Sequence, residues 1–281
     1  MPIVSVIIRL YRRTQTAFGI LPPAIRTTAG DSTGDPANPP CIRPPTPRLP
    51  LPQPHIFFRG AKSSGYKARS AFKLLQLDDE FNLFASATRC VDLCAAPGSW
   101  SQVAVQKLAA QANRKVVAVD LQPMKPIPGV SILRGDITKQ ETVDRVLHAM
   151  GGVLADLVIC DGAGDVTGMH DMDMYIQSDL ISAAIVIMMS LLRPGGAFVA
   201  KVFCKGSLPL VQSQMEMLFD DVCFHKPPAS RASSYESFLV CRDYLGPPHN
   251  VSKFLPFLAS GSLTGSDACT HTHVGRNGDS T

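Results

Sequence analysis

Small residues fill the middle of Val91-Asp92-Leu93-Cys94-Ala95-Ala96-Pro97-Gly98-Ser99-Trp100, a stretch that joins an apolar run to a helical pattern. Residues 89–94 have the composition of a buried strand, and residues 101–108 have the spacing of a helix. Small side chains between a strand and a helix let a ligand approach the backbone closely. The stretch therefore predicts a nucleoside-cofactor loop at the carboxyl end of a first parallel strand, with an ordinary strand-to-helix turn as the alternative.

An acidic residue closes the next strand pattern, because Asp120 directly follows the apolar run of residues 115–119. An acid at the end of a second strand commonly binds ribose hydroxyls in such folds, which favours the cofactor loop over the ordinary turn. The loop lacks the G-x-G-x-x-G spacing of dinucleotide sites and the Gly-Lys-Ser/Thr ending of triphosphate loops. We therefore expect a nucleoside cofactor that is neither a dinucleotide nor a triphosphate.

The composition sets bounds on the fold and on the partner. A chain of 281 residues with 45% hydrophobic residues can bury a substantial core. A net charge of +4 permits an anionic partner but does not demonstrate one. The eight cysteines include no C-x-x-C pair, and buried free thiols in a reducing compartment are the expectation. No apolar run is long enough to cross a membrane.

Both ends of the chain differ in composition from the middle. The first thirty residues contain arginines but no acid, which is typical of a mitochondrial transit segment and also compatible with an unstructured terminus. Residues 31–54 are rich in proline and predict a disordered linker. We expect a disordered extension over residues 1–55, one domain over residues 56–243 and a mostly flexible tail over residues 244–281.

Strand and helix patterns alternate along the middle of the chain. After the first two strands, further strands are predicted at residues 130–133, 155–160 and 197–203, and a long helix at residues 173–192. Thr138 and Glu141 fit a capping box that opens another helix. The last two strands, residues 222–225 and 237–241, have no helix between them and predict an antiparallel hairpin. The fold class is therefore α/β, with a mainly parallel sheet that helices cover on both faces.

A basic segment precedes the first strand. Residues 67–81 predict a helix, and the basic residues of residues 59–73 alternate with aromatic ones. Such a segment could hold phosphates and stack bases, and a solvated helix face is the alternative.

The stretch Asp92–Gln102 resembles the S-adenosylmethionine loop of the FtsJ family of RNA ribose 2′-O-methyltransferases. It is most similar to the eukaryotic branch that methylates the tRNA anticodon loop, and the similarity runs from about Ile56 to Cys241. The resemblance implies a Rossmann-like, seven-stranded, S-adenosylmethionine-dependent methyltransferase sandwich and no metal. It also implies a tRNA substrate and two partner proteins that direct site choice, one with helical repeats and one with WD repeats.

Four ionisable residues match the Lys-Asp-Lys-Glu tetrad of that family, namely Lys73, Asp161, Lys201 and Glu236. The sequence itself supports two of them. Asp161 ends an apolar strand, and Lys201 interrupts another, where a buried amine is costly unless paired or functional. The alternative for Lys201 is a side chain that reaches solvent from an edge strand. The resemblance implies that Lys201 is the general base, that Lys73 is a second cation that steers the substrate, and that the two acids orient these groups.

The resemblance also assigns residues to S-adenosylmethionine. It implies that Gly98 allows backbone approach, that Trp100 shapes the methionine end and that Asp120 holds the ribose. It further implies that Asp136 holds the adenine amino group and that Asp161 lies near the sulfonium.

The chain departs from the family pattern at three places. The family has proline at Gly164, Arg-Gly-Arg at residues 204–206, and Lys-Pro-Arg-Ser-Ser-Arg at residues 226–231, where this chain has Pro228 and Ala229. Phosphate contacts are thereby lost. Two alternative functions follow: a mitochondrial ribosomal-RNA 2′-O-methyltransferase, favoured by the amino terminus, and a weakly active RNA-binding module, favoured by the lost arginines. The expected location is the cytoplasm, with the mitochondrion as the alternative.

Overall fold

A computed structural model describes residues 65–163, 170–203, 208–231 and 234–247. The predicted extension over residues 1–55 and nearly all of the predicted tail over residues 244–281 lie outside these ranges. So do Gly164 and residues 204–206, where the chain departs from the family pattern.

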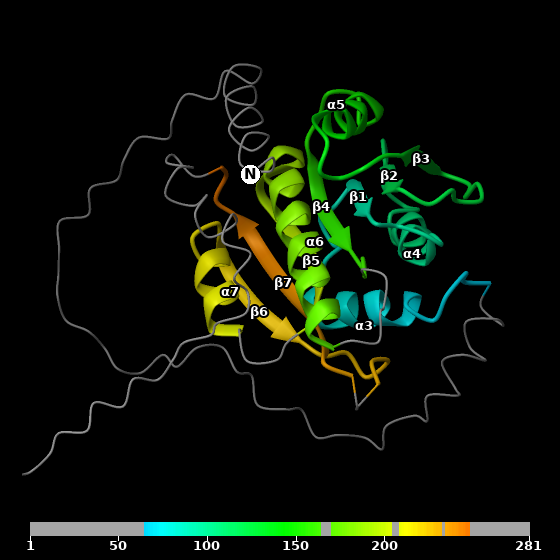
Figure 1. Ribbon diagram of the computed structural model, residues 1–281. Coiled ribbons are helices and arrows are strands. Elements are labelled where there is room, and N and C mark those ends of the chain that lie inside the picture. Colours follow the sequence, from blue (N-terminus) through cyan, green and yellow to red (C-terminus); the bar gives the residue numbers. More distant parts are fainter. Residues whose placement is uncertain (1–64, 164–169, 204–207, 232–233, 248–281) are drawn as a thin grey trace, which may run out of the picture.

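Seven strands form one sheet in the order β3-β2-β1-β4-β5-β7-β6 (Figure 1). Strands β1 to β5 pair in parallel, and β7 pairs antiparallel with both β5 and β6. The predicted mainly parallel sheet with an antiparallel edge hairpin is therefore confirmed. The strands span Arg89–Leu93 (β1), Lys115–Asp120 (β2), Val130–Arg134 (β3), Ala155–Cys160 (β4), Leu192–Phe203 (β5), Phe219–His225 (β6) and Glu236–Tyr244 (β7).

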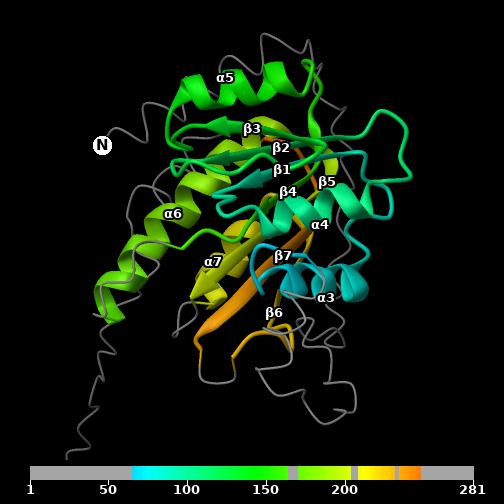
Figure 2. The ribbon, with the colours of Figure 1, turned by 90° about the vertical axis from the view of Figure 1, so that its right-hand side faces the viewer.

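Helices cover both faces of the sheet (Figure 2). One face packs against α3 (Ala71–Phe81) and α4 (Ser99–Lys107), and the other against α5 (Gln140–Ala149), α6 (His170–Leu191) and α7 (Leu208–Met215). Each face has its own apolar core, because the central strands are buried on both sides. Among the described residues, no helix is long and apolar enough to span a bilayer. The five described cysteines are free thiols, three of them buried.

The strand order reverses at β1. From β1 the chain runs outward to β2 and β3, and it then returns through α5 to place β4 on the other side of β1. In open α/β sheets, ligands bind at the carboxyl ends of the strands beside such a reversal. The carboxyl ends of β1, β2 and β4 are therefore the expected edge for a site.

Strand register decides which side chains share a face. Because side chains alternate along a strand, the pairs Asp92↔Ile159 and Lys201↔Phe238 identify the residues that point the same way. Ile159 and Phe238 belong to the core under α3 and α4. The side chains of Asp92 and Lys201 therefore lie on the α3/α4 face of the sheet.

Two predicted helix starts are wrong. Helix α3 begins at Ala71 rather than at residue 67, because the preceding residues form tighter turns in which main-chain N–H groups donate to the carbonyl three residues back. Helix α5 begins at Gln140 with Lys139 as its N-cap and no side-chain cap, so the predicted capping box is not formed. Thr138 lies one position before that cap, and its hydroxyl donates to Asp136 at 2.7 Å.

Asp156 fastens the amino ends of three strands, at the edge opposite the expected site. Its carboxylate accepts main-chain N–H groups of Thr88 and Arg89 at 2.8 Å each and pairs with Arg193 on β5. Burial raises the pKa of Asp156, but the Arg193 guanidinium and the hydrogen bonds from residues 88 and 89 outweigh it and hold the pKa below its usual value.

We expect Asp156→Asn to lower the free energy of unfolding by about 1–3 kcal/mol at pH 7, because it leaves buried donors and Arg193 poorly paired. The loss should shrink as the pH falls below about 4, because the carboxylate protonates first in the unfolded chain and only at lower pH in the folded protein. Urea denaturation at pH 7 and at low pH measures both effects. The exposed Asp79 provides a matched control, and Asp79→Asn should change the stability by less than about 0.5 kcal/mol. Equal effects of the two substitutions at pH 7 would contradict the assignment.

Candidate active site

The four tetrad residues come together as two ion pairs. The Lys73 amine on α3 lies 2.6 Å and 2.7 Å from the two carboxylate oxygens of Glu236 at the start of β7. The Lys201 amine on β5 lies 3.2 Å from the carboxylate of Asp161, just after β4, and donates to the main-chain carbonyl of Asp161 at 2.7 Å. A site drawn from four separate segments is thus assembled by the sheet.

Both amines are buried. The side chains of Lys73 and Lys201 are each 9% exposed. Strand β5 lies between β4 and β7, so Lys201 is on an inner strand, and the alternative of a solvent-reaching side chain on an edge strand is wrong. Charges at this depth are costly unless they are paired, and in the structure each amine has a carboxylate partner.

Glu236 links the two pairs electrostatically. Burial raises its pKa, but the charge of Lys73, hydrogen bonds from Lys73 and Ser230, and the charge of Lys201 outweigh it. The net pKa of Glu236 therefore lies below its usual value, so the carboxylate is ionised at neutral pH. The Ser230 hydroxyl donates to Glu236 at 2.8 Å, and the ring of Phe238 lies 5.6 Å from the Lys73 amine.

Gln177 on α6 holds the ends of β4 and β5 together, and sequence reasoning missed it. Its side-chain amide donates to the main-chain carbonyls of Lys201 at 3.0 Å and Gly162 at 3.2 Å. Only 3% of Gln177 is exposed. The spacing between the backbones that carry Asp161 and Lys201 is therefore set partly by this amide. A polar residue at a buried position of the predicted helix was its only sequence signal.

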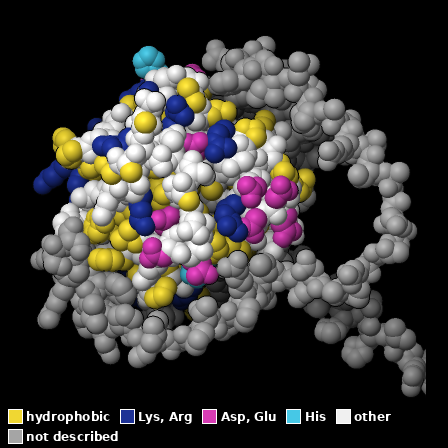
Figure 3. Space-filling model, turned by 180° about the vertical axis from the view of Figure 1, so that it is seen from behind, with side chains coloured by type: hydrophobic (Ala, Val, Ile, Leu, Met, Phe, Trp, Pro, Cys, Tyr) yellow, Lys and Arg dark blue, Asp and Glu magenta, His cyan; other side chains and the backbone are white. Residues whose placement is uncertain are grey.

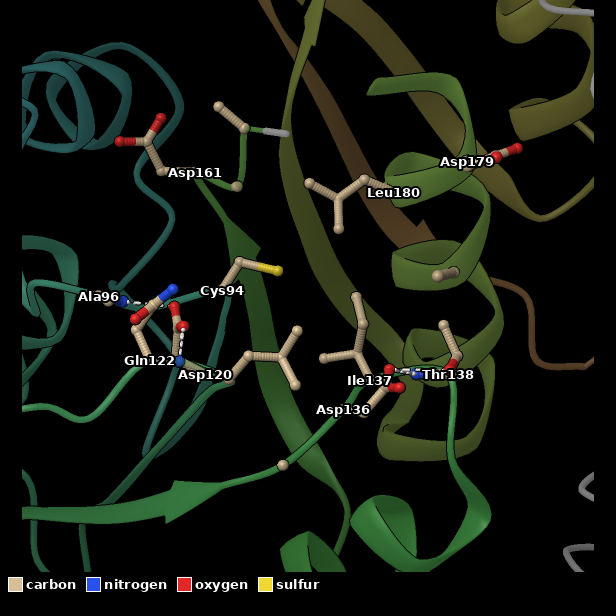
Figure 4. Close-up of a pocket in the computed structure, with 15 residues that line it drawn as sticks. Cys94, Ala96, Asp120, Gln122, Asp136, Ile137, Thr138, Asp161, Asp179 and Leu180 are labelled. Carbon is tan, nitrogen blue, oxygen red and sulfur yellow. Dashed lines mark hydrogen bonds between the residues drawn. The ribbon is translucent and has the colours of Figure 1, made fainter. Parts of the chain in front are cut away.

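A cavity of about 690 Å³ opens beside the tetrad (Figure 4). Its walls come from the loop after β1, from the carboxyl ends of β2, β3 and β4, and from α6. Three predicted cofactor residues line it, namely Asp120, Asp136 and Asp161. Asp161 therefore belongs both to the cavity wall and to the tetrad.

The two outer acids are held in place by the backbone. Asp120 accepts the main-chain N–H of Ala96 and that of Gln122, each at 2.7 Å. Asp136 accepts the main-chain N–H and the hydroxyl of Thr138 with one carboxylate oxygen, at 2.9 Å and 2.7 Å. Within the described ranges, no hydrogen bond reaches its other oxygen, so Asp136 retains an acceptor for a ligand in the cavity.

Gly98 and Trp100 do not line the cavity. Gly98 has φ +104°, and a Cβ there would lie 2.4 Å from the side chain of Ile127, so the loop requires glycine. Trp100 is 1% exposed, and its indole N–H donates to the carbonyl of Ser70 at 2.9 Å. The structure thus places both residues in the support of the loop, and their contact with a cofactor stays a prediction.

Asp92 lies buried beneath the loop and accepts a hydrogen bond from the Ser101 hydroxyl at 2.5 Å. Its other carboxylate oxygen has no partner among the described residues. Burial raises the pKa of Asp92 to about 7, and the charges of Asp161 and Asp120 add to the shift. Near neutral pH, this carboxyl therefore exchanges between its charged and neutral forms. No group of three potential ligand residues that could hold a metal occurs within the described ranges.

Comparisons with known proteins identify the family of the chain. The family model described as FtsJ-like methyltransferase matches residues 66–244. The human tRNA (cytidine(32)/guanosine(34)-2′-O)-methyltransferase is 51% identical over 208 residues, which cover 74% of this chain and 62% of that protein. The Schizosaccharomyces pombe protein of the same name is 48% identical over 235 residues, which cover 75% and 82%.

A solved structure has the same fold. A ribosomal RNA methyltransferase from Plasmodium falciparum superposes with a TM-score of 0.59 at 24% identity, over 65% of this chain and all of that one. This likeness concerns the fold alone.

The raised pKa of Asp92 gives a pH-dependent prediction. Between about pH 4 and 7 the folded protein holds a proton on Asp92 that the unfolded chain has lost, so this residue makes the fold less stable as the pH rises. We expect Asp92→Asn to gain stability relative to the native protein from pH 5 to pH 8, by about 2–3 kcal/mol.

Thermal denaturation of the native protein and of Asp92→Asn at pH 5 and at pH 8 measures this gain in stability. Ser101→Ala removes the hydrogen bond that favours the carboxylate of Asp92. The loss of stability with rising pH should therefore extend to higher pH in this variant. A stability difference between Asp92→Asn and the native protein that does not change with pH would show that the buried carboxyl keeps an ordinary pKa.

Proposed function

The chain belongs to the FtsJ-like methyltransferase family, and from this premise we propose that it methylates the ribose 2′-hydroxyl of a nucleotide in the tRNA anticodon loop, with S-adenosylmethionine as the methyl donor. One observation carries the proposal: two buried lysine–carboxylate pairs lie beside a cavity that is lined by Asp120 and Asp136. A tRNA substrate is proposed because relatives 51% and 48% identical to this chain are tRNA (cytidine(32)/guanosine(34)-2′-O)-methyltransferases. The chain spans 62% of the length of the human relative, so the activity and partners of the whole protein remain part of the proposal.

The cavity suits S-adenosylmethionine in size and chemistry. A volume of about 690 Å³ lies within the range of small-molecule sites. Asp120 is proposed to hold the ribose hydroxyls, and the free oxygen of Asp136 is proposed to accept the adenine amino group. When bound, the cofactor supplies an electrophilic methyl group on a sulfonium. Asp161 lies where the cavity meets the tetrad, so this end is the proposed place of transfer.

Lys201 is proposed to take the proton from the ribose hydroxyl, which is a poor nucleophile until that proton leaves. Lys201 is nine-tenths buried, and Lys73 forms the other ion pair of the same site. Asp161 contacts the Lys201 amine through its carboxylate and its carbonyl, so orientation is its proposed task.

Glu236 is proposed to hold Lys73 in position as the second cation. The carboxylate reaches the amine through both oxygens and is itself fixed by Ser230. Ser230 lies in the segment where this chain departs from the family pattern at Pro228 and Ala229. The segment therefore still supports the tetrad, and the departures concern RNA binding. Helical-repeat and WD-repeat partners for site choice and a cytoplasmic location remain proposals drawn from the resemblance.

Mapping of ribose 2′-O-methyl groups in cells with and without the protein tests the proposed function. We expect the loss of methylation at one or two anticodon-loop nucleotides of tRNA. Loss confined to mitochondrial ribosomal RNA would support the second candidate, which the acid-free first thirty residues favour. Unchanged methylation in both RNA classes would leave only the RNA-binding module and would refute the proposed enzyme.

Substitution of Lys201 tests the proposed base. Lys201→Ala and Lys201→Arg should both lower the rate of methyl transfer by about 10²–10⁴, because guanidinium cannot accept a proton at working pH. Calorimetry should show S-adenosylmethionine binding close to that of the native protein in both variants. The assay needs the natural tRNA and any required partner. A Lys201→Arg enzyme with native activity would reduce Lys201 to an electrostatic clamp and exclude it as the base.

A further inference from the structure

Two lysines from distant segments meet beside the loop 94–98. The Lys67 amine donates to the main-chain carbonyl of Lys125 at 2.9 Å. The Lys67 main chain is fixed by Gln102 of α4, and Lys125 lies in the connection between β2 and β3. Both lysines are exposed. A defined main-chain contact thus holds one cation next to the residue that carries another.

This pair of cations has no acid to balance it. Among the described residues, no carboxylate forms an ion pair with Lys67 or Lys125. Burial and the charge of Lys125 both lower the pKa of Lys67, so the two charges oppose each other. On the face seen in Figure 3, the largest group of acidic side chains lies in one patch, and further acidic side chains are scattered among the basic ones. An anion bound between the two lysines would relieve their repulsion.

The position points to the RNA. A Cβ built on Gly98 would lie 3.6 Å from the Lys67 amine, so the pair borders the loop under the cavity. Lys67 precedes the tetrad residue Lys73 by six residues, a distance of at most about 20 Å along the chain. Neither lysine is among the residues that line the cavity, so the pair lies outside it.

We propose that Lys67 and Lys125 form a binding site for one backbone phosphate of the RNA, close to the nucleotide that enters the tetrad. The inference rests on the proposed function and adds to it the place where the RNA strand is held. Phosphate is the anion that every nucleotide offers, and lysine binds it as a point charge. The site lies on other segments than residues 204–206 and 228–229, where this chain lacks the family's arginines.

Binding of an unmodified tRNA anticodon stem-loop RNA at 50–200 mM salt tests the site. Lys67→Ala and Lys125→Ala should each weaken binding about twofold to fivefold at low salt, as expected for an exposed ion pair. The logarithm of the association constant falls with the logarithm of the salt concentration, and each substitution should make this slope shallower by about 0.7, the value for one phosphate contact on a single strand. Since both lysines bind one phosphate, the double variant should lose less binding free energy than the sum of the losses in the two single variants. Lys125→Arg should retain the native slope.

Lys115 provides the matched control, because it is exposed but lies at the amino end of β2, at the opposite edge of the sheet. Lys115→Ala should leave the affinity and the slope unchanged. If the native protein binds the RNA and both alanine variants show the same salt dependence as the native protein, the phosphate site is overturned and the proposed function stands. Weaker S-adenosylmethionine binding with an unchanged slope would move the pair to the cofactor and also overturn it. Failure of the native protein to bind the RNA at any salt, with any required partner present, would overturn both proposals.

Discussion

Two amines are buried next to two carboxylates at one edge of the sheet, and the surrounding structure keeps these four charges paired. Removing either partner of a buried ion pair leaves an uncompensated charge, which typically costs about 3–5 kcal/mol. Lys73 and Glu236 come from residues 163 positions apart, and they meet only because α3 packs on the face to which β7 directs its first side chain. The antiparallel pairing of β7 with β5 then places this pair beside Lys201. The site therefore depends on the complete sheet and cannot form from any single segment.

Local patterns in the sequence were sufficient to predict the architecture. Apolar runs separated by helical spacing predicted the parallel strands. Their position at strand ends indicated Asp120 and Asp161 as acids near a ligand, because the carboxyl ends of parallel strands meet at one edge. The role of Asp136 came from the resemblance. Lys73 and Glu236 follow no spacing rule, and only the resemblance to a known family identified them.

Other features depend on contacts that no local pattern contains. Gln177 matters because its amide reaches two carbonyls on different strands. The buried state of Asp92 depends on α4 lying above β1. The capping box at Thr138 fails because α5 begins one residue later than predicted, with Lys139 as its N-cap.

The side chain of Gln177 holds main-chain carbonyls, so its contacts do not depend on which side chains follow β4 and β5. The spacing between the strands that carry Asp161 and Lys201 is set partly by an amide that bridges two carbonyls, in addition to the direct pairing of β4 with β5. Pro228 and Ala229, where this chain differs from the family pattern, lie in another place, the connection between β6 and β7. The next residue of that connection, Ser230, donates to Glu236. A change at residues 228–229 can therefore reach the Lys73–Glu236 pair through Ser230, whereas the Asp161–Lys201 spacing has its own support on α6.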